Sequence, residues 1–265
     1  AMKVFIMTDL EGASGVAGRW EDFGPGGRVH EEARRLLTGD VNAAVEGALR
    51  GGADEIVVLD GHGDAFSILI EQLHPTAKLI RGRRVLEMEG LDESFGAVLA
   101  VGAHAMAGAP LALLCHTLSH TAIHEIRVNG APVGEVGLWA MIAGTYGVPL
   151  VMVAGDAAAV EEARRLLGDV EGVAVKRATS MYAAECLHPS ITRKMISEAA
   201  EKAVRRAMQG SLKPLKLPKP VELSVVYTLP SMAETVSKRP GVRRLDGRTV
   251  SYKGDSILEC MSMLL

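Results

Sequence analysis

The chain has 265 residues, 48% of them hydrophobic and 23% charged, so it can bury a large core and fold as an ordered globular protein. The formal net charge is −3 and no dense basic block is present, so we expect no nucleic-acid partner. No apolar run reaches the ~20 residues of a membrane span, and no charged-then-apolar leader precedes the first predicted strand, so we expect a cytoplasmic protein without a membrane partner.

Short apolar runs alternate with helical patterns along residues 1–210. Buried strands are predicted at 3–8, 55–59, 97–101 and 150–154, with further strand candidates at 77–80, 123–128 and 172–176. Helices are predicted at 30–50, 135–145, 157–167 and 190–209. This alternation predicts an α/β fold, with a mainly parallel sheet covered by helices on both faces.

The C-terminal part of the chain has a different pattern. Residues 211–220 read SLKPLKLPKP and, with three prolines, are predicted to form a linker. Strands are predicted at 221–227 and 248–252, followed by a helix at about 255–264. We therefore predict a catalytic α/β domain at residues 1–210 and a small α+β subdomain at residues 221–265.

Polar residues follow the ends of three predicted parallel strands. Asp9 and Glu11 follow the first strand, His62 follows the strand at 55–59, and His104 follows the strand at 97–101. Sites in such sheets form beyond the carboxyl ends of the strands, and carboxylate and imidazole groups are ligands for divalent metals. With Glu135 at the start of a predicted helix, the set favours a metal-dependent hydrolase. Taken singly, each position has an ordinary alternative, such as a solvated loop, a turn or a first-turn helix acid.

Three of the eight histidines, His116, His120 and His124, lie within residues 115–124. A histidine titrates near neutral pH, so one of them could act as a general acid or base. A polar loop with incidental histidines is the alternative. The residues alone do not choose between His116 and His120.

The three cysteines are far apart in the sequence, at Cys115, Cys186 and Cys260. Their odd number and the lack of CxxC spacing argue against a disulfide framework and against a structural zinc site of the cysteine type. Free cysteines fit a reducing cytoplasm.

Five segments, taken in order, resemble the zinc-dependent D-aminopeptidase family found in dipeptide-transport operons. They are MTDLEGASGV at 7–16, DGHGDAFSI at 60–68, LHPTAKLIRG at 73–82, VGAHAMAG at 101–108 and RVNGAPVGEVGLWA at 127–140. The resemblance extends over nearly the whole chain. It implies a site with two Zn²⁺ ions per subunit, whose ligands match Asp9, Glu11, His62, His104 and Glu135, with Asp9 as the bridge. The family's catalytic histidine is matched by His116, with His120 as a rival.

The resemblance also implies a function and an assembly. Members use a metal-activated water to release the N-terminal residue of short peptides, D-amino-acid peptides among them, and form decamers of two stacked pentameric rings. Two alternatives stay open: a dimetal hydrolase for phosphoesters or non-peptide amides, and a non-catalytic metal-binding protein on the same fold. The sequence does not fix a preference for D- or L-residues, the physiological peptide or the metal.

Overall fold

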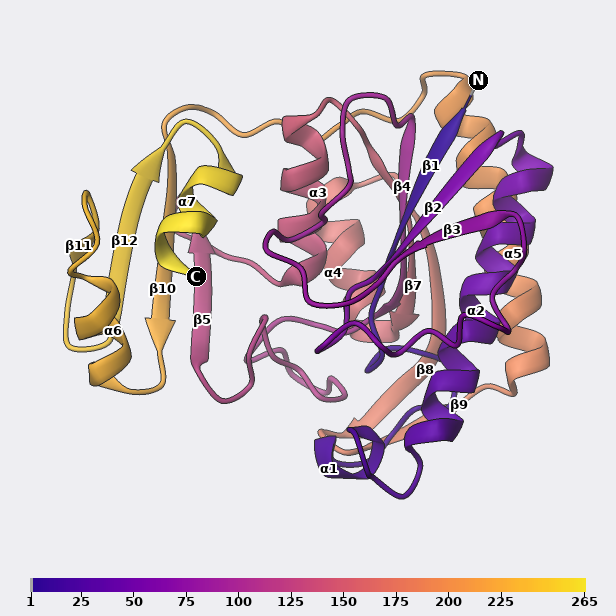
Figure 1. Ribbon diagram of the computed structural model, residues 1–265, viewed down its shortest axis with the longest axis horizontal. Helices are drawn as coiled ribbons and strands as arrows, with labels where there is room; N and C mark the ends of the chain where they lie inside the picture. The colour runs from indigo at the N-terminus through magenta and orange to yellow at the C-terminus, as the bar shows by residue number, and fades with distance from the viewer. Residues whose placement is uncertain (1) are drawn as a thin grey trace.

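Residues 2–265 are described by a computed structural model, which contains two sheets and the helices around them (Figure 1). The larger sheet has seven strands in the order β3-β2-β1-β4-β7-β8-β9, and all neighbours are parallel except β8 and β9. The strands are β1 (Lys3–Thr8), β2 (Glu55–Asp60), β3 (Ala77–Ile80), β4 (Ala97–Ala103), β7 (Leu150–Asp156), β8 (Glu171–Ser180) and β9 (Ala183–Cys186). The predicted α/β fold with a mainly parallel sheet is confirmed.

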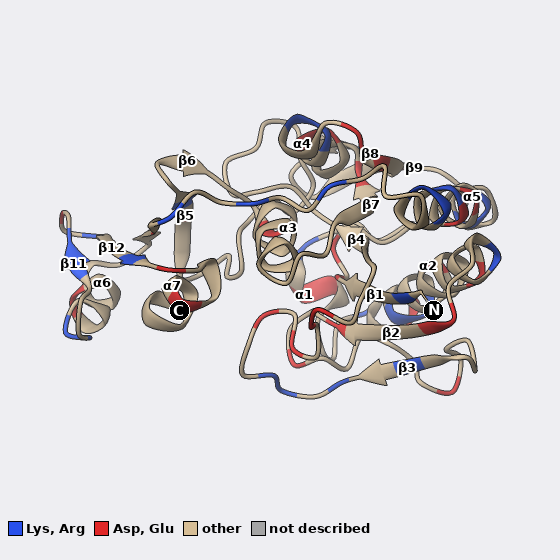
Figure 2. Cartoon of the chain, turned by 90° about the horizontal axis from the view of Figure 1, so that it is seen from above, with Lys and Arg blue, Asp and Glu red and all other residues tan. Residues whose placement is uncertain are grey.

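Helices cover both faces of the larger sheet (Figures 1 and 2). On one face lie α2 (His30–Gly51) and α5 (Pro189–Met208), and on the other lie α3 (Glu135–Thr145) and α4 (Ala157–Leu167). Side chains of β1 alternate between the two layers: Val4 and Ile6 pack with α2 and α5, whereas Phe5 and Met7 belong to the core that includes α3 and α4. A strand that is buried on both faces explains the continuous apolar run in the sequence.

The smaller sheet is antiparallel, with five strands in the order β11-β12-β10-β5-β6. Its strands are β5 (Ile123–Val128), β6 (Ala131–Pro132), β10 (Val221–Tyr227), β11 (Arg243–Arg244) and β12 (Thr249–Gly254), and its helices are α6 (Pro230–Val236) and α7 (Ile257–Leu264). Alternate residues of β10 are buried, and they join the same core as α3.

The smaller sheet takes strands from two distant parts of the chain. Strand β5, which the sequence analysis placed within residues 1–210, pairs with β10 after the linker rather than with the larger sheet. Its alternating burial is typical of an antiparallel strand with one solvated face. A tight turn follows it, since Asn129 and Gly130 have positive φ values of 50° and 83° and join β5 to β6. The division into domains at residues 211–220 stays a prediction.

Within residues 2–265, no helix combines the length and the apolar character that crossing a membrane requires.

Candidate metal centre

The six predicted site residues lie together at the carboxyl edge of the larger sheet. Strands β1, β2 and β4 are neighbours, so Asp9, His62 and His104, which follow their ends, meet at one edge. Glu135 is the first residue of α3, and His116 comes from the loop between β4 and β5. All of these except His62 are less than 10% exposed.

Two glycines allow the loop after β1 to approach the end of β4. The Gly12 N–H donates to the Gly102 carbonyl at 2.8 Å, and the Asp9 N–H donates to the Val101 carbonyl at 2.9 Å. A Cβ on Gly12 would lie 1.9 Å from the Ala103 oxygen, and a Cβ on Gly102, whose φ is +81°, would lie 1.8 Å from the Asp9 oxygen. Only glycine fits at either position, which is the physical reason for the DLEG and VGAH motifs.

The ligand atoms form two clusters in which all members lie within 4.8 Å of one another: Asp9, Glu11 and His62, and His104, His116 and Glu135. His62 Nε2 is 3.4 Å from Glu11 Oε1. His104 Nε2 is 3.1 Å from Asp9 Oδ2 and 3.2 Å from Glu135 Oε1. Asp9 therefore contacts both clusters, and its carboxylate is the group that could bridge two ions.

Each histidine of the centre turns its Nδ1 away from the carboxylates. Nδ1 of His104 lies 3.0 Å from the Ala105 carbonyl, and Nδ1 of His116 lies 2.8 Å from the Leu114 carbonyl, so both nitrogens carry the proton that is donated. Nδ1 of His62 lies 3.0 Å from the Ser67 hydroxyl. These outer bonds orient the rings and leave Nε2 directed at the carboxylates, as in metal-binding histidines.

Buried polar atoms without hydrogen-bond partners indicate that these residues fit a metal ion. Asp9 Oδ2, Glu11 Oε2 and His104 Nε2 are buried and have no hydrogen-bond partner among residues 2–265. Leaving a buried polar atom without a partner costs free energy, which a bound cation would remove. Carboxylate oxygens and imidazole nitrogens are the donor set of zinc sites in hydrolases.

Burial and neighbouring charges shift the pKa values of the two carboxyl groups Asp9 and Glu11 in opposite directions. Burial raises the pKa of Asp9 to about 8, with a further contribution from the Glu11 charge. Burial acts in the same direction on Glu11, but the charge of His62 outweighs it and the pKa of Glu11 is well below its ordinary value. Burial would lower the pKa of His62, but the Glu11 carboxylate raises it to about 9. Cation binding would satisfy the same negative charge.

His116 and His120 differ in their distance from the carboxylates. His116 Nε2 lies 3.9 Å from Glu11 Oε1 and 3.9 Å from Glu135 Oε1, and its ring stacks on His104 with centroids 4.0 Å apart. His120 instead stacks on Trp20, at 4.1 Å between centroids, and belongs to neither cluster. Burial, with the charge of His104, lowers the pKa of His116, which favours a neutral imidazole.

The sequence analysis missed a buried lysine under the centre. Lys176 of β8 is 2% exposed, and its Nζ donates to the carbonyl oxygens of Glu11, Ala13 and Val16 at 2.5, 2.7 and 2.5 Å. Burial lowers the pKa of Lys176 to about 8. The lysine thus holds the loop that carries Glu11. A lysine within the apolar run VAVK was the available signal.

Two buried carboxylates act on the charge of Lys176 and bond to nearby loops. The Ser14 N–H donates to Asp40 Oδ2 at 2.8 Å, and the Leu113 N–H donates to Asp156 Oδ2 at 3.2 Å. Both carboxylates help to keep the Lys176 amine protonated.

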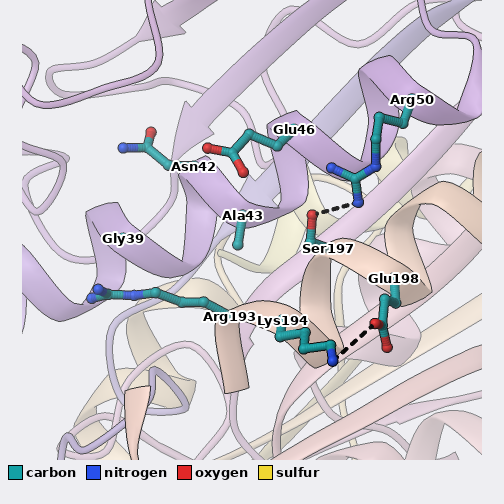
Figure 3. A pocket seen from close by; sticks show the side chains of 9 residues that line it. All are labelled: Gly39, Asn42, Ala43, Glu46, Arg50, Arg193, Lys194, Ser197 and Glu198. Atoms are coloured by element: carbon teal, nitrogen blue, oxygen red, sulfur yellow. Dashed lines mark hydrogen bonds and ion pairs between the residues drawn. The ribbon is translucent and has the colours of Figure 1, made fainter. Parts of the chain in front are cut away.

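A groove between α2 and α5 lies apart from the centre (Figure 3). It is lined by charged and polar side chains that pair with one another, such as Arg50 with Ser197 and Lys194 with Glu198. None of the six candidate residues lines it, so it is not a rival for the metal centre.

Comparisons with known proteins agree with the geometry. Residues 2–265 match the family model described as D-aminopeptidase. A D-aminopeptidase of Bacillus subtilis strain 168 is 34% identical over 271 residues, which cover 100% of this chain and 96% of that protein. The solved structure of the zinc-dependent D-aminopeptidase DppA from Bacillus subtilis, described as a self-compartmentalizing protease, superposes with a TM-score of 0.91 at 33% identity, covering 99% of this chain and 96% of that one. The family resemblance predicted from the motifs is confirmed, and the chain belongs to the D-aminopeptidase family.

Proposed function

We propose that this protein is a zinc-dependent aminopeptidase that removes the N-terminal residue of short peptides, D-amino-acid peptides among them. The observation that carries the proposal is the pair of buried ligand clusters that share Asp9. The names of the relatives, a D-aminopeptidase and a zinc-dependent D-aminopeptidase, support the same activity.

We assign five residues to hold two zinc ions: Asp9, Glu11, His62, His104 and Glu135. Asp9 would bridge, because it lies in one cluster and its Oδ2 is 3.1 Å from His104 of the other. Bound zinc supplies a Lewis acid for the scissile carbonyl and a water that loses its proton near neutral pH. The acidic side chains also offer a partner for the α-ammonium group of a peptide.

We assign proton transfer to His116. Its Nδ1–H is held by the Leu114 carbonyl, so Nε2 faces the clusters. A neutral imidazole at this position can take a proton at Nε2 and deliver it to the leaving amine as the C–N bond breaks. The same nitrogen, once protonated, can donate a hydrogen bond to the developing oxyanion.

The proposal also includes a homo-oligomeric assembly and a cytoplasmic location. A self-compartmentalizing relative supports a homo-oligomer, for which we propose a decamer of two stacked pentameric rings. A cytoplasmic location agrees with three free cysteines, one of which, Cys186, is exposed.

The test compares metal-free and zinc-loaded protein on matched substrates. Release of the N-terminal residue from D-alanyl and L-alanyl dipeptides should disappear after chelation and return with zinc. p-Nitrophenyl phosphate serves as the phosphoester arm, and we expect no zinc-dependent turnover of it. Equal peptide cleavage by metal-free and zinc-loaded protein, or zinc-dependent cleavage of the phosphoester alone, would rule the proposal out.

A further inference from the structure

A pocket of about 650 Å³ lies between the loop that follows β3 and the helix α7 of the smaller sheet. Its size falls in the range of ~300–1,000 Å³ that is typical of small-molecule sites. Figure 2 shows the loop after β3 extending toward α7, with blue basic segments along it. The lining residues are Gly63, Asp64, Arg83, Arg84, Val85, Leu86, Glu87, Leu118, Leu258, Met261, Ser262 and Leu265.

The pocket adjoins the metal centre at two points. Gly63 and Asp64 directly follow the candidate ligand His62 in the chain. Leu118 lines the pocket, and its N–H donates to Glu135 Oε1 at 2.7 Å. A molecule in the pocket can therefore extend toward the candidate zinc ligands.

The walls of the pocket combine apolar and polar side chains, and part of the apolar wall is open to solvent. Val85 and Leu86 on the loop are 90% and 47% exposed, although both are large hydrophobic residues. Leu258 and Met261 of α7 line the pocket as well. Exposed apolar side chains around a concave surface are typical of a binding site.

Two arginines line the pocket, and only one of them has an ion-pair partner in the described part of the chain. Arg84 Nη2 lies 3.4 Å from Glu87 Oε2, and Glu87 Oε1 also accepts the Trp139 Nε1–H at 3.1 Å. Arg83 is exposed and has no carboxylate within 4.0 Å among residues 2–265. Asp64, two residues after His62 in the chain, is the second acidic side chain of the lining beside Glu87. An unpaired guanidinium binds a carboxylate strongly, often through two parallel hydrogen bonds.

We propose that this pocket binds the C-terminal part of the peptide substrate, with Arg83 holding its free α-carboxylate against the apolar wall of the loop and α7. The inference rests on the proposed aminopeptidase function and narrows its substrate class to short peptides with a free C-terminus. A long chain or a blocked C-terminus would place no carboxylate in the pocket. Arg84 and Glu87 pair with each other, which leaves, within residues 2–265, Asp64 and Arg83 as the charged groups of the lining free to meet the two charged ends of a short peptide.

The test measures kcat/KM of the zinc-loaded enzyme for dipeptides and tripeptides as free acids and as C-terminal amides. If Arg83 forms a charge-assisted hydrogen bond with the peptide carboxylate, kcat/KM for the acids should exceed that for the amides by about 10- to 100-fold. Arg83→Met should bring the acid-to-amide ratio close to one, mainly through a rise in KM for the acids. Arg83→Lys, which keeps the charge but not the fork, should retain part of the preference. Arg243→Met, an exposed arginine on β11, is the matched control and should keep the wild-type ratio.

Two results would overturn the inference while leaving the proposed function intact. One is equal cleavage of acids and amides by the wild-type enzyme. The other is an Arg83→Met variant that lowers kcat/KM for acids and amides by the same factor. If neither acids nor amides were cleaved by the zinc-loaded protein, the proposed function itself would fail, and the inference with it.

Discussion

The larger sheet buries ionisable side chains at its carboxyl edge, whereas the smaller sheet buries an apolar layer along β10. At the edge of the larger sheet Asp9, Glu11 and His104 are at most 5% exposed, and three of their polar atoms have no hydrogen-bond partner within residues 2–265. In β10 the buried positions include Leu223 and Val225, both 0% exposed. The first arrangement costs stability unless a cation is bound, and the second contributes stability. The comparison therefore places the candidate metal site at the edge of the larger sheet, whereas the buried side chains of β10 serve the stability of the fold.

The largest expected effect separates the two histidines of the centre. His116→Ala should lower kcat by about 10²- to 10⁴-fold, the usual range for a general acid or base, while both zinc ions remain bound. His120→Ala, the matched control, should change kcat by no more than a few-fold, because that ring contacts Trp20 rather than the carboxylates. Steady-state kinetics and zinc content per subunit measure both quantities. Loss of one zinc ion in His116→Ala would make His116 a ligand instead.

The next prediction concerns the smaller sheet. Leu223→Ala should lower the free energy of unfolding by about 2–5 kcal/mol, because it leaves a cavity in the core that β10 shares with α3 and α7. Kinetics per folded, zinc-loaded subunit should stay at the wild-type value. Urea denaturation at a fixed protein concentration, with the half-exposed Leu245→Ala as control, measures the loss. A lower kcat of Leu223→Ala with an unchanged free energy of unfolding would contradict the view that the smaller sheet contributes to stability rather than to catalysis.

A pH experiment tests the cost of buried charge on α2, which packs on the larger sheet. Burial raises the pKa of Asp40 from 3.8 to about 6. Asp40 therefore binds its proton more tightly in the folded state than in the unfolded state. The stability that this proton contributes is present below about pH 4 and is lost as the pH rises to about 6. Relative to Asp40→Asn, the wild-type protein should lose about 3 kcal/mol across this window. Denaturation of metal-free wild type and variant at pH 4 and pH 7 measures the difference, and an unchanged difference would contradict the account.

The smallest effect is expected from the lysine under the centre. Lys176→Met removes the donor of three carbonyl groups, including that of Glu11, so the loop should hold its metal ligand less firmly. Loss of such an outer-shell contact typically lowers metal affinity by about 10- to 100-fold. A zinc competition titration measures it, with the exposed Lys238→Met as control. Equal zinc affinity in wild type and Lys176→Met would show that the loop is held by its other bonds.

The sequence was sufficient for the parallel strands of the larger sheet and for the grouping of the candidate ligands at its edge, because both follow local rules. Apolar runs on β1, β2 and β4 predict parallel strands, and the rule that sites form beyond their carboxyl ends places Asp9, His62 and His104 together. The end of the helix predicted at 30–50 also follows a local rule, since Gly52 ends α2 with a φ of 106°.

The remaining features depend on contacts between distant residues. Strand β5 alternates as an antiparallel strand should, but its partner β10 lies after the linker, and no local pattern specifies that pairing. In the sequence, Lys176 follows an apolar strand run as many strand lysines do. Only the fold places its amine against the Glu11 carbonyl. The difference between His116 and His120 is likewise one of position, since both lie in one loop and only His116 reaches the carboxylates.

The central claim is that the two clusters each hold one zinc ion and share Asp9. Diffraction from zinc-loaded crystals at the zinc absorption edge tests it most directly. The account predicts two anomalous peaks per subunit, one beside Asp9, Glu11 and His62 and the other beside Asp9, His104 and Glu135. A single peak at full loading, or peaks at residues outside these clusters, would contradict it.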